Sequence, residues 1–273
     1  MRLLAVAVAG RGLVDPAEPV FTAGDEALLR GRAVFETVRV YGGRPFRLDD
    51  HVARLASSSA GVELPAPDRD ECRRLAVLAV DAVGPSDLGL RLYWTGTTLV
   101  ATAAAIPAEL EEARRRGIRL VSLPLGADAV RPGWLFSGVK STSYAVNMAA
   151  EAEARRRGAD DALFLAAGNV VLEAPISNIW WRRGEALFTP ALELGVLAGV
   201  TRATVLELAP PRFRVVEGTF TFDELRAADE AFTSSSIREL LPVVELDGSP
   251  IGDGTPGEAA RRLQSELRLR ATG

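Results

Sequence analysis

Three residue types that carry much of enzyme chemistry are almost absent from this chain of 273 residues, which has one cysteine, one histidine and one lysine. A single cysteine excludes an internal disulfide and suits a reducing compartment, so we expect a cytoplasmic protein in which Cys72 packs on a helix. There is no clustered histidine and cysteine set for zinc, so we expect no metal site. A catalytic serine or cysteine paired with histidine would depend on His51 alone. His51 follows Asp49, a plausible helix N-cap, and we expect it at the surface or behind the site.

Lysine is the most informative of the three. Lys140 is the only lysine, so 31 of the 32 basic residues are arginines (32 − 1). Arginine keeps its proton at physiological pH, whereas a lysine amine can lose its proton and act as a nucleophile. Lys140 therefore marks a position where arginine is chemically unable to act, unless this one lysine remains by chance. The residues around Lys140 are therefore needed to distinguish a chemical role from chance.

Long apolar runs and an excess of one charge are also missing. The apolar start, residues 3–9, is too short for a secretion signal and is typical of a first strand followed by a turn. We find no run long enough to span a membrane. The net charge is −4 and the arginines are spread among acidic residues, so we expect neither a nucleic acid nor a membrane as partner.

The length of the chain predicts about two domains with a cleft between them. Alternating apolar residues predict a strand over 34–41, and Gly42 and Gly43 follow as a hairpin turn. Further elements of this part are helices at about 49–60 and 68–82 and a strand pair at 88–94 and 99–105. We assign a small N-terminal domain to residues 1–122, a connection rich in proline and glycine to 123–134, and a larger domain to 135–273.

In the larger domain, alanine, glutamate and arginine without glycine or proline predict a helix over 145–157 that ends at Gly158. A strand from 160 to 165, a turn at 167–169 and a second strand ending at Glu173 follow. Lys140 thus lies just before a helix and Glu173 at a strand end, where both side chains could face one pocket. The remaining elements are a helix at 201–209 and strands near 213–216, 230–233 and 242–246.

Three more features indicate an anion site. The segment Gly199–Arg202 opens a helix, where free backbone N–H groups and the helix dipole attract phosphate. The run Thr233–Ser236 follows a predicted strand and supplies hydroxyl donors, and Arg54 can bind a phosphate with a bidentate fork. Capping, a turn and a solvated arginine explain each feature alone. Only their combination with Lys140 and Glu173 points to a binding site.

In this order the motifs resemble the class IV (fold type IV) pyridoxal-phosphate aminotransferases, a group that includes D-amino-acid and branched-chain aminotransferases, (R)-selective amine transaminases and aminodeoxychorismate lyase. The resemblance covers nearly the whole chain, through Phe35–Arg39, His51–Leu55, Lys140–Tyr144 with Asn147, Glu173–Asn178, Leu197–Arg202 and Thr233–Val243. It implies a two-domain, mixed α/β fold like that of D-amino-acid aminotransferase, with a small N-terminal α/β lobe. The larger C-terminal lobe would carry a mixed, barrel-like sheet with flanking helices. It also implies a homodimer whose pocket is completed by first-lobe loops of the partner.

The resemblance implies a role for each matching residue toward pyridoxal 5′-phosphate. Lys140 would form the Schiff base with the cofactor aldehyde, Glu173 would keep the pyridine nitrogen protonated, and Tyr144 would hydrogen-bond the ring O3′. Phosphate and other cofactor contacts would come from Arg54, Ser177, Asn178, Gly199, Val200, Thr201, Ser235 and Ser236. The freed Lys140 amine would then move a proton in a ping-pong cycle between an amino donor and a 2-oxo acid.

Substrate selection is the part that the sequence leaves open. D-amino-acid aminotransferases often carry an Arg-x-His pair after the strand near residue 92, but here that loop reads Thr95–Val100, and the corresponding arginine of typical lyases is also missing. Arg91 matches a strand arginine of branched-chain and atypical D-amino-acid enzymes, although a structural ion pair would also explain it. Other substrate candidates are Arg30, Arg32 and Phe35. We expect a D-amino-acid transaminase. Aminodeoxychorismate lyase, a branched-chain or (R)-amine transaminase, and a non-catalytic cofactor-binding protein are the alternatives.

Overall fold

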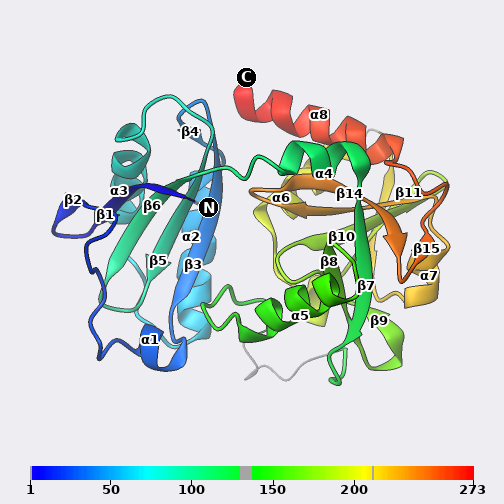
Figure 1. The fold of residues 1–273 in the computed structure, drawn as a ribbon, viewed down its shortest axis with the longest axis horizontal. Coiled ribbons are helices and arrows are strands. Elements are labelled where there is room, and N and C mark those ends of the chain that lie inside the picture. Colours follow the sequence, from blue (N-terminus) through cyan, green and yellow to red (C-terminus); the bar gives the residue numbers. More distant parts are fainter. Residues whose placement is uncertain (1, 130–136, 211) are drawn as a thin grey trace. The chain divides into compact units, whose positions relative to one another are not determined.

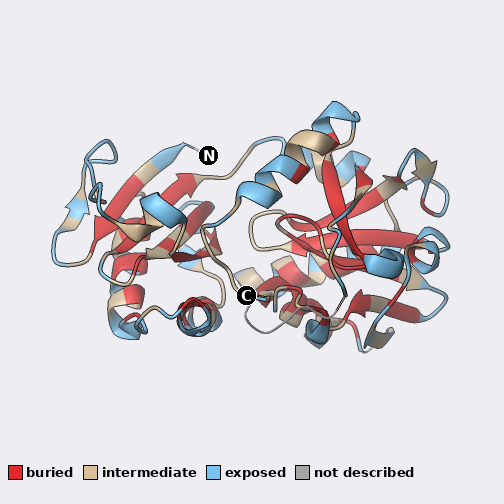
Figure 2. Ribbon diagram, turned by 90° about the horizontal axis from the view of Figure 1, so that it is seen from below, coloured by how far each residue is buried: buried red, intermediate tan, exposed pale blue. Residues whose placement is uncertain are grey.

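Two β-sheets, each with its own helices, organise the chain in the computed structural model, which describes residues 2–129, 137–210 and 212–273 (Figure 1). The chain divides into two units by its internal contacts. Unit 1 comprises residues 1–107 and 139–144 with Thr272, and unit 2 comprises residues 108–138 and 145–271 with Gly273. In both units the buried residues concentrate in the strands and on the helix faces that cover them (Figure 2).

The described part of unit 1 contains a six-stranded antiparallel sheet in the order β2-β1-β6-β5-β3-β4. Its strands are β1 (Leu3–Val8), β2 (Gly12–Val14), β3 (Val34–Tyr41), β4 (Arg44–Pro45), β5 (Leu88–Trp94) and β6 (Leu99–Ala105). The helices are α1 (Glu26–Arg30), α2 (Leu48–Gly61) and α3 (Arg69–Asp81). Helices α2 and α3 cover one face of the sheet, because Val34, Val38 and Val40 alternate along β3 and pack with apolar residues of both helices. The opposite face carries Phe35.

The described part of unit 2 contains a nine-stranded mixed sheet in the order β12-β11-β10-β13-β14-β7-β8-β9, with β15 paired to β14. Its strands are β7 (Ile118–Pro124), β8 (Asp161–Ala166), β9 (Val170–Val171), β10 (Asn178–Arg183), β11 (Ala186–Pro190), β12 (Arg214–Gly218), β13 (Glu230–Ser235), β14 (Glu239–Leu246) and β15 (Ser249–Pro250). The helices are α4 (Leu110–Arg116), α5 (Ala145–Arg156), α6 (Val200–Leu208), α7 (Phe222–Arg226) and α8 (Glu258–Thr272), with 3-10 turns η1 (Ala167–Asn169) and η2 (Leu192–Leu194). This mixed α/β architecture confirms the class expected from the sequence.

The bounds of the two units differ from the domain ranges expected from the sequence. Helix α4 and strand β7 precede residue 125 but pack and pair within the unit 2 sheet, whereas residues 139–144 cluster with unit 1. Part of the expected connection, residues 130–134, lies outside the described residues. The domain ranges 1–122 and 135–273 therefore stay a prediction.

One detail of the expected helix starts is wrong. Helix α2 follows Arg47, whose backbone is left-handed with φ 54°, and no side chain caps its first turn. Asp49, expected as the N-cap, instead lies in the first turn and binds Arg73 of α3. The prediction for Cys72 is confirmed, since it is buried on α3 against the unit 1 core.

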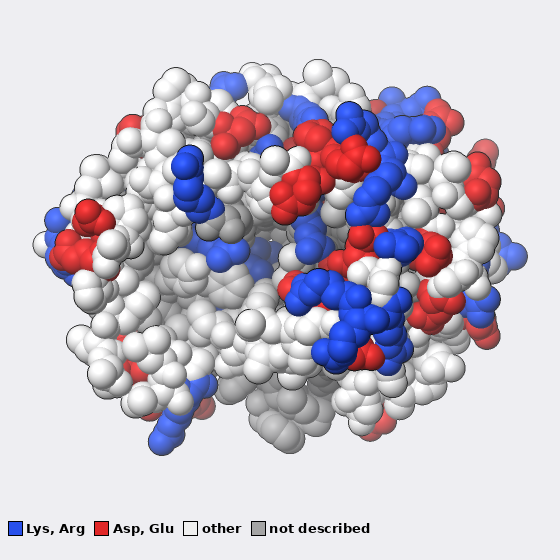
Figure 3. Space-filling model, viewed as in Figure 1, with Lys and Arg blue, Asp and Glu red and all other residues white. Residues whose placement is uncertain are grey.

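Charged side chains on the face drawn in Figure 3 are mixed, with basic and acidic residues beside one another. Ion pairs in unit 2 include Arg114 with Glu111 and Arg268 with Glu111. Within the described residues, none of the helices combines the length and the apolar character needed to cross a membrane. The same residues contain no group of three or more histidine, cysteine, aspartate or glutamate side chains arranged to hold a metal ion.

Candidate functional site

The main chain of Lys140 pairs with the edge of the unit 1 sheet. The N–H of Phe35 donates to the Lys140 carbonyl at 3.1 Å, and the N–H of Thr142 donates to the Ala33 carbonyl at 2.9 Å. These bonds place the segment beside the first half of β3, on the edge that β4 occupies farther along the strand. Sheet pairing therefore fixes the lysine backbone next to Phe35.

The C-terminal turn of α2 also contacts the segment that contains Lys140. The N–H of Lys140 donates to the hydroxyl of the buried Ser58 at 3.2 Å. Val139 packs against Gly61 so closely that a Cβ atom at position 61 would lie 2.6 Å from the Val139 Cγ2 atom. A glycine at position 61 lets the lysine segment approach the helix.

The Lys140 side chain lies among aromatic rings. Its Nζ atom is 3.2 Å from the Tyr144 hydroxyl and 4.4 Å from the centre of the Phe35 ring. The Phe35 ring makes an edge contact with Tyr144 at 5.2 Å and stacks on Tyr93 at 6.0 Å between ring centres. The structure thus brings the predicted residues Lys140, Tyr144 and Phe35 together, with an amine and a phenol within hydrogen-bonding distance.

Arg54 binds a buried carboxylate. Its Nε and Nη2 atoms donate to the two oxygens of Glu36, each at 2.7 Å, and His51 Nδ1 lies 2.7 Å from Glu36 Oε2. Burial alone would raise the pKa of Glu36, but the charge and hydrogen bonds of Arg54 and the His51 contact lower it to about 2. Burial lowers the pKa of His51 despite the Glu36 contact. Of the two positions expected for His51, the surface one is wrong, because the residue is 1% exposed, and the structure places the ring behind Arg54, on Glu36.

Glu36 is a residue that the sequence reasoning missed. It lies between Val34 and Val38 on the strand face that packs against α2, and the other residues that β3 presents on that face are valines. A charged residue in the buried stripe of an otherwise regular strand was the signal that could have identified it.

Arg91 lies on the same sheet face as Phe35. The register of β3 and β5 pairs Phe35 with Tyr93 and Thr37 with Arg91, so the four side chains alternate onto one side of the sheet. Arg91 is half-buried, and its Nη1 atom donates to the Tyr93 hydroxyl at 3.3 Å. A guanidinium thus lies one residue pair along the sheet from the Phe35 ring that contacts Lys140.

The other two arginines among the substrate candidates differ from Arg91. The Arg32 guanidinium donates to the Val62 and Glu63 carbonyls at 3.1 and 2.9 Å and to Glu26 at 3.0 Å, which ties α1 to the end of α2. Arg30 is exposed in the last turn of α1. The structure does not bring either side chain to the Lys140 amine.

In unit 2, Glu173 follows β9 and is held by the segment before α6. The N–H of Leu197 donates to both carboxylate oxygens at 3.1 Å. Asn178 Nδ2 donates to Glu173 Oε2 at 3.1 Å and to the Leu197 carbonyl at 2.9 Å. Both donors fix the orientation of a half-buried carboxylate that can accept a further hydrogen bond.

The start of α6 lies against the same asparagine. Gly199 is its N-cap residue and has no side-chain cap, so backbone N–H groups of the first turn remain for a ligand. A Cβ atom at position 199 would lie 2.2 Å from Asn178 Oδ1, so that either the asparagine side chain or the start of α6 would have to move. Val200 and Thr201 are buried in the first turn. Asn178 and Gly199 together join the Glu173 carboxylate to this helix start.

Hydroxyl groups gather near the end of β13, which packs against α6. Ser235 and Ser236 are half-buried there. The expected strand end at residue 233 was too early, because β13 continues to Ser235. Of the run Thr233–Ser236, only Ser236 therefore lies after the strand. The Oγ atoms of Ser177 and Thr233 are buried, and neither finds a hydrogen-bond partner among the described residues.

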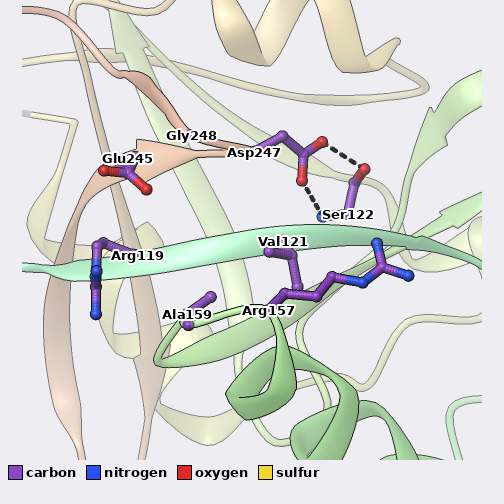
Figure 4. A pocket seen from close by; sticks show the side chains of 9 residues that line it. Arg119, Val121, Ser122, Arg157, Ala159, Glu245, Asp247 and Gly248 are labelled. Carbon is purple, nitrogen blue, oxygen red and sulfur yellow. Dashed lines mark hydrogen bonds between the residues drawn. The ribbon is translucent and has the colours of Figure 1, made fainter.

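A separate cavity of about 480 Å³ lies on unit 2 (Figure 4). It is lined by residues of β7, residues 157–159 after α5, Glu245 of β14 and the β14–β15 turn. Ser122 donates its N–H and its hydroxyl to the Asp247 carboxylate at 2.7 and 2.6 Å. None of the site residues expected from the sequence lines this cavity. It is a surface hollow apart from the chemistry described above.

Known proteins resemble the chain along most of its length. The family model described as amino-transferase class IV matches residues 33–246. D-alanine aminotransferase of Bacillus licheniformis is 30% identical over 272 residues, which cover 94% of this chain and 93% of that protein. A bifunctional aminodeoxychorismate lyase / D-amino acid transaminase of Mycobacterium tuberculosis is 32% identical over 218 residues, 72% of this chain and 75% of that protein.

The fold is also similar to that of a solved structure. A hypothetical aminotransferase from Mycobacterium tuberculosis in its pyridoxal-phosphate-bound form superposes with a TM-score of 0.92 at 27% identity. The superposition covers 98% of this chain and 99% of that one.

Proposed function

Since the chain belongs to the class IV aminotransferase family, whose members are pyridoxal-phosphate-dependent transferases, we propose that it transfers amino groups between a D-amino acid and a 2-oxo acid. The observation that carries this proposal is the position of Arg91 on the sheet face of Phe35, whose ring lies 4.4 Å from the Lys140 amine. A fixed guanidinium on this face suits a substrate that carries a carboxylate. The names of the two relatives described above support the D-amino acid.

The residues present fit pyridoxal 5′-phosphate by their chemistry. Unit 1 offers Lys140, an amine that can bind an aldehyde, with Tyr144 beside it and Arg54 as a cation for phosphate. Unit 2 offers Glu173 for a pyridine nitrogen and, for phosphate, the start of α6 with Ser235 and Ser236. The buried Ser177 hydroxyl, which lacks a partner among the described residues, adds a donor next to Asn178. We propose that both sets act on one cofactor.

The bound cofactor supplies an aldehyde that takes up the amino group and a ring that stabilises negative charge on the substrate carbon. The chain supplies the proton movements. The Lys140 amine acts as base and then as acid, and the Tyr144 hydroxyl at 3.2 Å orients it. The Glu173 carboxylate, held by Leu197 and Asn178, keeps a proton on the pyridine nitrogen.

A half-reaction screen tests the substrate class. The holoenzyme receives D-alanine, D-glutamate, L-leucine or (R)-1-phenylethylamine separately and without an acceptor, while its absorption spectrum is followed. The proposal expects rapid conversion of the spectrum with at least one D-amino acid and slow or no conversion with the other two compounds. Faster conversion with L-leucine or the amine than with either D-amino acid would refute it.

Aminodeoxychorismate lyase is the second candidate, because the relative from Mycobacterium tuberculosis carries that activity in its name together with D-amino acid transamination. The same residues would act in the elimination of pyruvate. Incubation with aminodeoxychorismate separates the two reactions, since a lyase releases pyruvate without any acceptor and without conversion of the cofactor. Pyruvate release faster than any half-reaction would make the lyase the main activity.

The assembly that we propose is a homodimer, in which the exposed α1 region with Arg30 contributes to the partner's site. The family resemblance and the exposure of Leu28 and Leu29 on α1 support it. Sedimentation of an active species with the chain mass of 29.1 kDa would contradict the dimer. The single cysteine supports a cytoplasmic location, which cell fractionation tests.

A further inference from the structure

The carboxylate of Glu36 is fully buried in the core between β3 and α2, yet it adds nothing to apolar packing. Removing a carboxylate from water costs much free energy unless charges and hydrogen bonds compensate. Here both oxygens are used, by two nitrogens of Arg54 and by His51. Since apolar residues in place of a whole buried ion pair often suit a core equally well, the carboxylate calls for another explanation.

The three residues form a fixed arrangement with no net charge. Glu36 carries one negative charge and Arg54 one positive charge, while burial lowers the pKa of His51 and keeps its ring neutral. Two of the five N–H groups of the Arg54 guanidinium, both on one edge, donate to the Glu36 carboxylate. The plane and the direction of the Arg54 head are thereby set before any ligand binds.

Helix α2 connects this arrangement to the lysine. Arg54 and Ser58 are four residues apart and lie on one side of the helix. Ser58 accepts the hydrogen bond from the Lys140 N–H, so one helix face carries both the guanidinium and the support of the lysine segment. Helix α2 therefore carries Arg54 and also supports the Lys140 segment, while Glu36 of β3 sets the orientation of the guanidinium.

We propose that Glu36 is a positioning residue for phosphate recognition, which acts by holding the Arg54 guanidinium in one orientation with the help of His51. The inference rests on the proposed role of Arg54 as a phosphate ligand. A long arginine side chain loses rotamer freedom when it binds a ligand, and an arginine that is already fixed has lost that freedom on folding. A single orientation also lets the planar fork meet phosphate oxygens along two N–H bonds.

A competing electrostatic effect predicts the opposite change in phosphate affinity when the charge of Glu36 is removed. The negative charge of Glu36 partly cancels the attraction of Arg54 for a phosphate, so removal of that charge would strengthen phosphate binding if charge alone mattered. If positioning matters more, the same removal weakens phosphate binding. The sign of the change in phosphate affinity separates the two.

The test compares pyridoxal 5′-phosphate with pyridoxal, which lacks the phosphate. The dissociation constants of both compounds are measured by absorbance on the cofactor-free protein, and their ratio reports the phosphate alone. For Glu36→Gln we expect the preference for the phosphorylated compound to fall by about 10- to 100-fold, with pyridoxal affinity unchanged. An increased or unchanged preference, or an equal loss for both compounds, would overturn the proposal.

Two further variants separate this inference from the role of Arg54. Arg54→Lys keeps the charge but loses the fork, and an unchanged phosphate preference in this variant would mean that Arg54 is not the phosphate ligand. If Arg54→Lys lowers the preference and Glu36→Gln does not, Arg54 binds phosphate but Glu36 does not position it. In the double variant, we expect no loss beyond that of Arg54→Lys, and additive losses would contradict an action through Arg54.

Controls distinguish positioning from folding. Ser59 is buried on α2 and its hydroxyl donates to the Leu55 carbonyl, so Ser59→Ala disturbs the same helix without touching Glu36. We expect this variant to keep the phosphate preference. Glu36→Asp keeps the charge with a shorter reach, and should give an intermediate preference even where Glu36→Gln fails to fold. A preference in Glu36→Asp equal to that of the unaltered chain would reject the geometric requirement.

Discussion

The Nζ atom of Lys140 lies 3.2 Å from the hydroxyl of Tyr144, four residues farther along the chain. The two side chains share the Phe35 ring as a neighbour, at 4.4 Å from the amine and 5.2 Å from the Tyr144 ring centre. A phenol this close can hydrogen-bond the amine in either protonation state, because it both donates and accepts. The relationship lies entirely within unit 1, between residues 139–144 and β3.

Replacing Lys140 should abolish turnover, and arginine should be no better than alanine, because a guanidinium cannot attach to an aldehyde and holds its proton. Borohydride reduction of the holoenzyme should leave the cofactor attached to the chain at Lys140. Mass spectrometry can read the label without ambiguity, since no other lysine exists in the sequence. Substantial activity in Lys140→Arg would disprove the assignment of the lysine.

Replacing Tyr144 by phenylalanine should lower the rate of the proton transfer and leave the fold intact. The change removes one neutral hydrogen bond, which is worth about 0.5–1.5 kcal/mol, so we expect a loss of about 2- to 10-fold. Single-turnover kinetics with a deuterated donor at the α-carbon should show a larger isotope effect as proton transfer becomes slower. An unchanged rate and isotope effect would place the hydroxyl outside the reaction.

The local composition around Lys140 and Glu173 was enough to predict their elements. Helix α5 ends before Gly158, and the antiparallel pair of β8 and β9 leads to Glu173, as the sequence predicted. These elements depend on neighbours in the chain, which a single sequence displays.

Contacts between segments that are distant in the chain could not be predicted from local composition. Arg54 was expected as a free phosphate fork because nothing local to α2 reveals that Glu36 lies under it on β3. The hydrogen bonds from Leu197 and Asn178 to Glu173 also join three segments of the chain. The Leu197 donor is a backbone N–H, which every residue except proline has, so the sequence does not mark it. The expected Asp49 cap failed because the left-handed Arg47, at the end of the preceding hairpin, sets where α2 begins.

A methyl group at position 199 should weaken cofactor binding. In Gly199→Ala the new Cβ atom would lie 2.2 Å from Asn178 Oδ1, so either the asparagine or the start of α6 must move. Asn178 also donates to Glu173, and therefore both the carboxylate and the helix start are disturbed. We expect cofactor affinity to fall by about 10-fold or more. Gly24→Ala is the matched control, because no atom lies within 4 Å of its added Cβ. Equal cofactor affinity in both variants would contradict this coupling.

Removing Arg91 should affect amino acids more than amines. A charge-assisted contact with a carboxylate is worth about 1.5–3 kcal/mol, so Arg91→Ala should slow the amino-acid half-reaction by about 10- to 100-fold. Amines without a carboxylate never make this contact and should react almost as before. Both half-reaction rates are measured in the same variant. Equal losses would mean that Arg91 is structural, and Arg30 would become the next candidate.

Acid should destabilise unit 1 in two steps. The buried His51 stays neutral in the folded state because its pKa is lowered from 6.5, whereas the unfolded chain binds a proton below that pH. Stability is therefore lost as the pH falls below about 6.5. The pKa of Glu36 is lowered from 4.5 to about 2, so its contribution, about 3 kcal/mol, is complete above pH 4.5 and is lost as the pH falls toward 2.

Urea unfolding at a series of pH values measures this, with pulsed hydrogen exchange read on peptides of β3 and α2 so that unit 1 is followed by itself. We expect His51→Gln to remove the decline that begins near pH 6.5, because glutamine does not titrate. Glu36→Gln should remove most of the additional decline below pH 4.5 and should be less stable at neutral pH, where the carboxylate contributes in full. A flat stability of the unaltered unit 1 between pH 7 and pH 5 would show that His51 is charged in the folded state, and the neutral arrangement around Arg54 would then be wrong.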